Sequence, residues 1–223
     1  MTGYISQKID SIRQQVPQNV RLIAITKQVS VEAMREAYAT GIRDFGENRL
    51  QEALLKQEQL QDLNDINWHF IGHIQKNKAK KIIENFTWIH SVDSLALAKR
   101  LNRLAEELNQ IPKVFLQVKV LSDPNKYGWE VSNLLLDLPQ LSQYQNLDFQ
   151  GLMTILPLGL SSTEVLDAFQ KTQQLATTIA QKDYENLKIK ELSMGMSGDY
   201  MQAIEAGATM IRLGRIIFGE RNS

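Results

Sequence analysis

Lys27 is the residue whose type and position could do the most specific chemistry. It follows an apolar run, Leu22 to Ile25, with only Thr26 between them. A lysine at the end of a buried strand is partly desolvated, and desolvation lowers the pKa of a lysine amine from about 10.4 and so supplies neutral amine. A neutral amine is the nucleophile that forms an imine with an aldehyde. The alternative is a lysine that only marks where the strand reaches solvent.

A second segment, Ser193 to Asp199, has the composition of an anion site. Three small residues, Gly195, Ser197 and Gly198, precede a helix that we expect to begin near Asp199. Backbone amides in such a turn, together with the start of a helix, bind phosphate. Gly214, which follows a later apolar run, could add one more amide. The alternative is a capped turn whose glycines serve only its tight geometry.

Arg212 lies within the last apolar run, Thr209 to Leu213. Its neighbours Ile211 and Leu213 would face the other side of a strand, so Arg212 would point inward. A buried guanidinium must be paired. Its partner would be a ligand phosphate, a ring nitrogen or a buried carboxylate.

Other polar residues favour simpler explanations. His69 and His73 are four residues apart, but the residues between them read as a strand entering a loop, so the pair would not share a helix face as zinc-binding histidines do. The lysine cluster from Lys76 to Lys81 has no interleaved aromatic residues, and a solvated helix face explains it better than nucleic-acid binding.

The elements that must position these residues alternate regularly between short apolar strands and longer helices. A helix over Ile5 to Val16 precedes eight strand-then-helix units. Ser30 and the Ser161–Glu164 capping box mark two helix starts. We predict strands at Leu22–Ile25, Ile42–Phe45, Trp68–Ile71, Trp88–Val92, Val114–Val120, Phe149–Ile155, Ile189–Leu192 and Thr209–Leu213.

Eight such units predict a single (β/α)8 barrel with an extra N-terminal helix, spanning residues 1–223 as one domain. The alternative is an open, doubly wound sheet. In a barrel, functional residues gather at the carboxyl ends of the strands. Asn48, Ser91 and Met153 would therefore join Lys27 and Arg212 at one mouth.

The composition excludes several classes of function. The 223 residues contain 25 Lys plus Arg and 25 Asp plus Glu, so net charge provides no long-range attraction to nucleic acid or to an acidic membrane. The chain has no cysteine, which excludes disulfides and thiolate catalysis and fits the cytoplasm. No apolar run approaches the ~18 residues expected of a membrane span.

The residues also resemble a known family, the pyridoxal phosphate homeostasis proteins, from about Val20 onward. The motifs that carry the resemblance are Ile25-Thr26-Lys27, Phe45-Gly46-Glu47-Asn48, His69 to Lys78, His90-Ser91-Val92-Asp93, Gly151-Leu152-Met153-Thr154, Leu192 to Asp199, and Ile211-Arg212-Leu213-Gly214. These proteins are fold-type III barrels that bind pyridoxal 5′-phosphate (PLP).

The resemblance implies a role for each matching residue. Lys27 matches the lysine that holds PLP as a Schiff base. Ser193, Met194, Gly195, Ser197, Arg212 and Gly214 match motifs that hold the phosphate and flank the pyridine ring. Asn48, Ser91 and Met153 match motifs that line the cofactor.

The function that the resemblance implies is intracellular PLP homeostasis, affecting vitamin B6 and amino- and keto-acid balance. The protein would store PLP and exchange it or deliver it to apoenzymes, with a regulatory protein as another candidate partner, and would act as a monomer without turnover of its own. The similar racemases carry a second domain, whereas only about nine residues follow the last strand here.

Three alternatives remain. A fold-type III amino-acid racemase or lyase would form product, and a sugar-phosphate enzyme would need a catalytic carboxylate, for which Glu47 is the candidate. A pure interaction module would not need Lys27.

Overall fold

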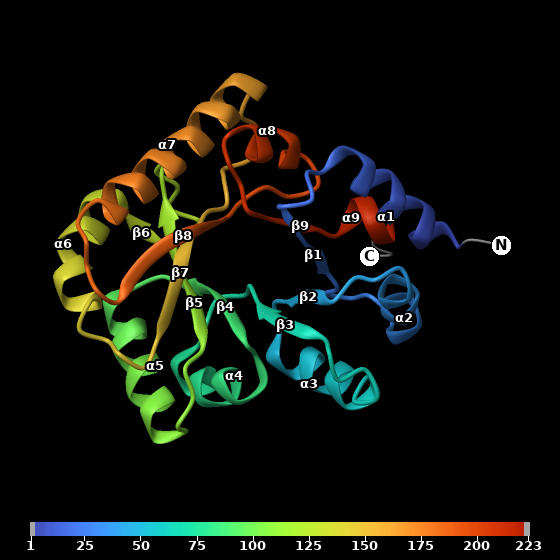
Figure 1. Ribbon diagram of the computed structural model, residues 1–223, viewed down its shortest axis with the longest axis horizontal. Coiled ribbons are helices and arrows are strands. Elements are labelled where there is room, and N and C mark those ends of the chain that lie inside the picture. Colours follow the sequence, from blue (N-terminus) through green and yellow to red (C-terminus); the bar gives the residue numbers. More distant parts are fainter. Residues whose placement is uncertain (1–2, 221–223) are drawn as a thin grey trace.

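The computed structural model describes residues 3–220 and contains a closed barrel of eight parallel strands (Figure 1). Each strand pairs with its neighbour in the order β1-β2-β3-β4-β5-β7-β8-β9, and β9 pairs back to β1. The strands are β1 (Arg21–Ile25), β2 (Asp44–Glu47), β3 (Asn67–Phe70), β4 (Trp88–Val92), β5 (Lys113–Lys119), β7 (Asp148–Met153), β8 (Leu187–Ser193) and β9 (Met210–Leu213). The closure confirms the predicted (β/α)8 barrel and shows that the open-sheet alternative is wrong.

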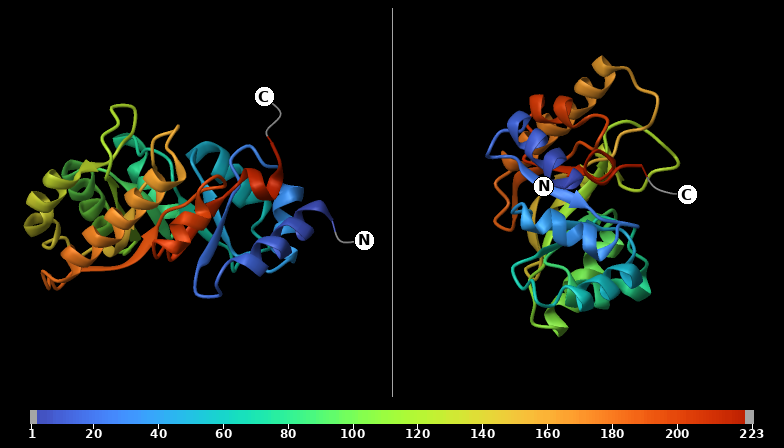
Figure 2. Two further views of the ribbon diagram at one scale, coloured as in Figure 1. Left: turned by 90° about the horizontal axis from the view of Figure 1, so that it is seen from above. Right: turned by 90° about the vertical axis from the view of Figure 1, so that its right-hand side faces the viewer.

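Helices surround the barrel: α2 to α8 lie between successive barrel strands, and α9 follows the last one (Figure 2). They are α2 (Val31–Ala39), α3 (Leu50–Gln59), α4 (Ala79–Asn85), α5 (Leu95–Glu107), α6 (Val131–Leu141), α7 (Ser162–Ala180), α8 (Tyr200–Glu205) and α9 (Arg215–Phe218). The extra N-terminal helix is α1 (Tyr4–Gln15), which packs against α2 and α9.

The two predicted helix starts are confirmed. The Ser30 side chain accepts a hydrogen bond from the backbone of Ala33, and Ser161 and Glu164 form a reciprocal capping box at the start of α7. The second strand begins two residues later than predicted, at Asp44, and continues through Gly46 to Glu47. Two short elements had no sequence signal: β6 (Trp129–Glu130), which pairs with β5 outside the barrel, and a 3-10 turn over Lys76–Lys78.

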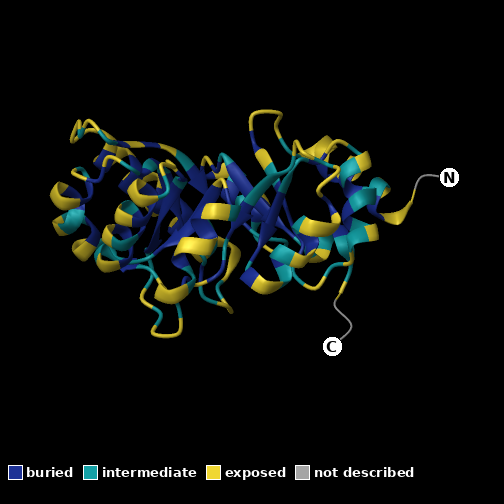
Figure 3. Cartoon of the chain, turned by 90° about the horizontal axis from the view of Figure 1, so that it is seen from below, coloured by how far each residue is buried: buried dark blue, intermediate teal, exposed yellow. Residues whose placement is uncertain are grey.

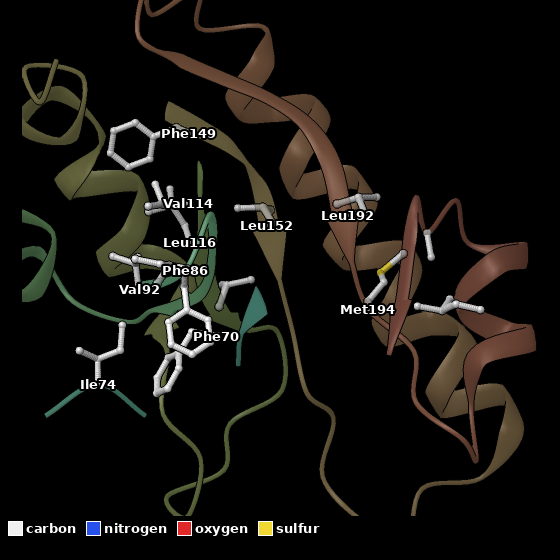
Figure 4. Close-up of a cluster of buried hydrophobic side chains, with 14 of the residues drawn as sticks. Phe70, Ile74, Phe86, Val92, Val114, Leu116, Phe149, Leu152, Leu192 and Met194 are labelled. Carbon is white, nitrogen blue, oxygen red and sulfur yellow. The ribbon is translucent and has the colours of Figure 1, made fainter. Parts of the chain in front are cut away.

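The barrel strands are largely buried, whereas exposed residues lie mainly on the outer helices and loops (Figure 3). Alternation along the strands separates the buried hydrophobic residues into two clusters. Ile23 and Ile25 of β1 join an inner cluster with Phe115 and Met153, while Ala24 between them joins the larger outer cluster. The outer cluster includes helix residues and therefore lies between barrel and helices. Figure 4 shows part of it, where the rings of Phe70 and Phe86 meet edge to face at 5.1 Å. Both sides of each strand are thus packed, which fixes the directions of the polar side chains at the strand ends.

Within residues 3–220, no helix is both long and apolar enough to cross a bilayer.

Candidate functional site

A cavity of about 550 Å³ opens at the carboxyl ends of the strands. The segments that line it follow β1, β2, β3, β7, β8 and β9, which come from both halves of the sequence. The lining residues are Ile25, Lys27, Asn48, Ile71, Gly72, Ile155, Leu158, Met196, Ser197, Gly198, Asp199, Arg212, Gly214 and Arg215. This is the end of the barrel at which functional residues are expected.

Five of the ten residues predicted for the site line this cavity: Lys27, Asn48, Ser197, Arg212 and Gly214. The other five lie just below or beside it. Met153 belongs to the inner cluster, and the Met194 side chain belongs to the outer one (Figure 4). Ser193, Ser91 and Gly195 support lining residues through the contacts described below. Sequence reasoning missed Ile155, Leu158 and Arg215, of which the first two are apolar and give no motif.

Arg212 is almost fully buried and points inward, as the alternation of β9 predicts. Its NH1 group donates to the Ser193 carbonyl (2.5 Å) and hydroxyl (2.7 Å), and its NH2 group donates to the Thr154 carbonyl (2.8 Å). Burial lowers the pKa of Arg212 to about 10, with the nearby Asp199 opposing this shift, so the guanidinium is cationic at neutral pH. Of its five N–H donors, these three are used, and two have no acceptor within residues 3–220.

A chain of hydrogen bonds leads from Arg212 through the barrel interior to Asp44 at the amino end of β2. The Ser193 hydroxyl, which accepts from Arg212, lies 2.8 Å from His90 Nδ1. The chain continues from His90 Nε2 to His69 Nδ1 at 2.9 Å, and from His69 Nε2 to an Asp44 carboxylate oxygen at 2.9 Å. Both imidazoles are fully buried. The chain therefore connects the cationic residue in the cavity with a carboxylate at the other end of the barrel.

The loop after β8 presents unused backbone donors to the cavity. The N–H groups of Ser197, Gly198 and Arg215 donate to no acceptor within residues 3–220. The Ser197 hydroxyl accepts from the backbone of Ile216 at 3.4 Å and so links this loop to the start of α9. Such a group of amides, close to Arg212 and Arg215, suits an anion.

Two residues fix the shape of this loop. Gly195 has φ +91°, and a Cβ there would lie 2.6 Å from the Cβ of Ala203, so only glycine fits. Asp199 accepts from the Met196 amide at 2.5 Å. Burial raises the pKa of Asp199, opposed by that hydrogen bond and by Arg212.

Asn48 and Gly72 form the wall of the cavity between β2 and β3. The Asn48 side-chain oxygen is buried and has no hydrogen-bond partner among the described residues. A buried acceptor of this kind costs free energy unless a ligand or water bonds to it. The Gly72 carbonyl accepts from the Ser91 hydroxyl at 2.5 Å, so Ser91 supports the wall from below.

Lys27 is half-buried in the turn that follows β1. Glu47, the carboxylate that the sequence offered as a catalytic candidate, accepts from the Thr26 hydroxyl at 2.6 Å, beside this turn. Glu47 is fully buried and does not line the cavity. It therefore does not offer the accessible catalytic carboxylate that a sugar-phosphate enzyme would need.

No cluster of metal-ligating side chains occurs within residues 3–220. His69 is inside the barrel, whereas His73 is 40% exposed and contacts Asp93 at 3.2 Å. His69 lies in β3 and His73 in the loop after it, so the two histidines do not share a helix face, as predicted.

The fold and the cavity define the class of the protein: a (β/α)8 barrel with a cavity at the carboxyl ends of its strands, lined by a lysine after β1 and by a glycine-containing loop after β8. Residues 2–222 match the family model described as alanine racemase, N-terminal domain. The alanine racemase of Clostridium difficile has the same fold with a TM-score of 0.80 at 15% identity, covering 99% of this chain and 57% of that one.

Relatives of higher sequence identity show to which family the chain belongs. A pyridoxal phosphate homeostasis protein of Synechocystis is 57% identical over 92% of this chain and 94% of its own length, and one of Pseudomonas aeruginosa is 42% identical over 92% and 86%. The structure of PipY from Synechococcus elongatus with PLP bound matches with a TM-score of 0.92 at 49% identity, covering 96% of this chain and all of that one. The chain belongs to the pyridoxal phosphate homeostasis protein family.

Proposed function

We propose that this protein binds PLP in the cavity at the carboxyl ends of the strands, with Lys27 holding the cofactor's aldehyde carbon as a Schiff base, and that it serves PLP homeostasis. The observation that carries the proposal is the convergence of Lys27, Arg212 and the unused amides of Ser197 and Gly198 on one cavity. PLP needs an amine, a partner for its ring nitrogen and donors for its phosphate, and these residues supply all three.

The donors and acceptors left over in the cavity fit this ligand. The amides of Ser197, Gly198 and Arg215 would hold the phosphate. Arg212 has two N–H groups to offer and would face the ring nitrogen. The buried oxygen of Asn48 would accept from a polar group of the ligand. The structure of the relative PipY with PLP bound supports PLP as the ligand.

Arg212 also favours storage over turnover. PLP supports carbanion chemistry by acting as an electron sink, and it does so best when its ring nitrogen is protonated. A permanent cation opposite that nitrogen disfavours its protonation. We therefore propose that the protein keeps and exchanges PLP and turns over amino acids poorly.

The first test is the near-visible absorption spectrum of the purified protein beside that of Lys27→Ala, each before and after borohydride. We expect a yellow wild type whose imine band is replaced by a stable reduced adduct on Lys27, and a variant without that band. A wild type that stays colourless with added PLP would contradict the proposal.

A second assay separates storage from racemisation. Purified protein is incubated with L-alanine or L-serine, and the D-isomer is measured. We expect no formation at ordinary enzymatic rates. Racemisation that Lys27→Ala abolishes would instead identify an enzyme of the alanine racemase type.

The proposal also covers the protein's oligomeric state, its binding partners and its location in the cell. We propose a cytoplasmic monomer that delivers PLP to apoenzymes or is governed by a regulatory protein. Mixing the PLP-loaded protein with an apoenzyme and a PLP-trapping reagent tests delivery, because direct transfer would restore the apoenzyme's activity faster than release into solution allows. Light scattering of the purified protein tests the monomer.

A further inference from the structure

A buried cluster of three charged residues lies behind the turn that carries Lys27. Lys56 of α3 is 7% exposed, and its ammonium group donates to Glu47 at 2.9 Å, to Glu52 at 2.6 Å and to the Thr26 carbonyl at 2.6 Å. Neither Lys56 nor the two glutamates lines the cavity. This cluster, Glu47, Glu52 and Lys56, is the Lys56 cluster below.

The three hydrogen bonds of Lys56 match the donors of an ammonium group. An ammonium group has three N–H donors, and each is used here. Glu52 provides a carboxylate opposite the ammonium group. Burial raises the pKa of Glu52, but the hydrogen bonds that it accepts from Lys56 and Gln28 outweigh this effect, so its pKa is lowered. Burial raises the pKa of Glu47, because the hydrogen bonds from Thr26 and Lys56 only partly offset its desolvation.

The Lys56 cluster holds the backbone on both sides of Lys27. Before it, the Thr26 carbonyl accepts from Lys56, and the Thr26 hydroxyl donates to Glu47. After it, the Gln28 amide donates at 2.5 Å to the same Glu52 oxygen that Lys56 contacts. One ammonium–carboxylate pair therefore connects the residues that precede and follow Lys27.

The turn needs such support because Gln28 has φ +60°. This left-handed conformation is unfavourable for a residue with a side chain. A backbone hydrogen bond from the Val29 amide to the Thr26 carbonyl, at 2.9 Å, also spans the turn. Without the Lys56 cluster, the turn would relax toward conformations in which Lys27 leaves its position in the cavity wall.

We propose that Lys56 is a positioning residue for Lys27: through Thr26 and, with Glu52, through Gln28, it holds the Lys27 turn in the geometry that retains PLP. The inference rests on the proposed function, since it concerns how tightly the same site keeps its cofactor. Lys56 acts through the backbone and does not touch the ligand.

The test compares Lys56→Met and Glu52→Ala with Asp62→Ala. Methionine keeps most of the volume of lysine and removes its charge and donors. Asp62→Ala is a matched control, because it breaks an exposed ion pair between Arg35 and Asp62, at 2.6 Å, which is remote from the Lys27 turn. Each protein is loaded with PLP, and the dissociation constant and the release rate are followed through the imine band at a temperature where all are folded by circular dichroism.

We expect the PLP dissociation constant of Lys56→Met to rise about tenfold, since the free energy of freeing one backbone residue is similar to that of a tenfold change in binding. Glu52→Ala should show a smaller rise in the dissociation constant. It also keeps the inference testable if Lys56→Met does not fold, because Lys56→Met leaves the buried Glu47 without its partner whereas Glu52→Ala does not. The effects of the two changes should be less than additive, because both act through one pair. Asp62→Ala should match the wild type.

The outcomes separate this inference from the proposed function. A wild type that forms no imine with PLP contradicts the proposed function itself. A wild type that binds PLP, beside folded Lys56→Met and Glu52→Ala proteins with wild-type affinity and release rate, overturns the positioning role of Lys56. A lower melting temperature with unchanged release also overturns it, because that is the result of a purely structural role.

Discussion

His90 Nε2 lies 2.9 Å from Nδ1 of His69, and the groups at the two ends of this buried pair fix the tautomers of both neutral rings. The Asp44 carboxylate can only accept, so His69 must carry its proton on Nε2 and accept at Nδ1. His90 therefore carries its proton on Nε2 and accepts from the Ser193 hydroxyl at Nδ1. Arg212 donates to the same hydroxyl. Every bond in the chain runs in one direction, from the arginine to the carboxylate, with both histidines neutral.

The neutral histidines predict a loss of stability in mild acid. Burial lowers the pKa of His90 well below its usual value and also lowers that of His69, where the hydrogen bond to Asp44 opposes the effect. The unfolded chain binds protons at these rings below pH ~6.5, whereas the folded chain does not. The free energy of unfolding should therefore fall as the pH drops below ~6.5, by up to about 1.4 kcal/mol per pH unit for each ring.

Urea unfolding of the wild type and of His90→Gln at pH 7 and pH 5.5 measures this effect. The variant should lose less stability between the two pH values than the wild type, whatever its stability at pH 7. His73→Gln is compared as the remaining histidine, because His73 is 40% exposed and lies outside the buried chain. An equal pH dependence in wild type and His90→Gln would show that His90 binds a proton as readily in the folded as in the unfolded protein, and would contradict the prediction.

Arg212 should contribute both to stability and to PLP binding. Arg212→Met leaves the Thr154 carbonyl without its guanidinium donor, whereas the Ser193 carbonyl keeps a hydrogen bond from the Thr154 amide at 3.2 Å. An unsatisfied buried carbonyl costs about 1–3 kcal/mol. Arg212→Lys keeps a cation but cannot reach both acceptors in the same fork geometry. We expect the free energy of unfolding, measured with urea, to decrease from wild type to Arg212→Lys to Arg212→Met. The affinity for PLP should decrease in the same order.

The exposed Arg215 provides the comparison for that series. Arg215→Met should leave the stability within about 0.5 kcal/mol of the wild type, as surface changes usually do. If Arg212→Met were as stable as Arg215→Met, the hydrogen bonds of Arg212 would make no net contribution to the free energy of unfolding.

The sequence predicted the features that depend on local pattern. Alternation in β9 indicated that Arg212 points inward, and the polar residues after the strands indicated which end of the barrel carries the cavity. The partner of Arg212 could not be predicted, because Thr154 and Ser193 are 58 and 19 residues away along the chain. Only barrel closure brings β7 and β8 beside β9.

The polar networks were missed for a related reason. Nothing local in the sequence shows that β3 and β4 place His69 and His90 in contact; His69 invited comparison only with His73, four residues further along the chain. The spacing of Glu52 and Lys56 is visible as an i,i+4 pair on α3, but most such pairs are exposed and weak. What distinguishes this pair is its contact with Thr26 and Gln28, which is a tertiary contact between α3 and the turn after β1.

Two glycines in the cavity wall differ sharply in the room around them, and this difference predicts the last outcome. A Cβ at Gly72 would lie 2.1 Å from the backbone oxygen of Asn48, whereas a Cβ at Gly198 would meet no heavy atom within 4 Å. Backbone cannot yield as a flexible side chain does, so Gly72→Ala must move Asn48 or the Gly72 carbonyl that Ser91 supports. Forced overpacking of this kind costs about 1–3 kcal/mol.

Gly72→Ala should therefore lower the melting temperature and weaken PLP binding together, since Asn48 forms part of the cavity wall. Gly198→Ala should leave the unfolding free energy within about 0.5 kcal/mol of the wild type. Thermal unfolding in the absence of PLP, followed by titration with PLP at a temperature where both variants are folded, gives the two quantities separately. A Gly72→Ala protein with the stability and PLP affinity of the wild type would mean that the wall between β2 and β3 yields freely, and that the position of Asn48 is not required for binding.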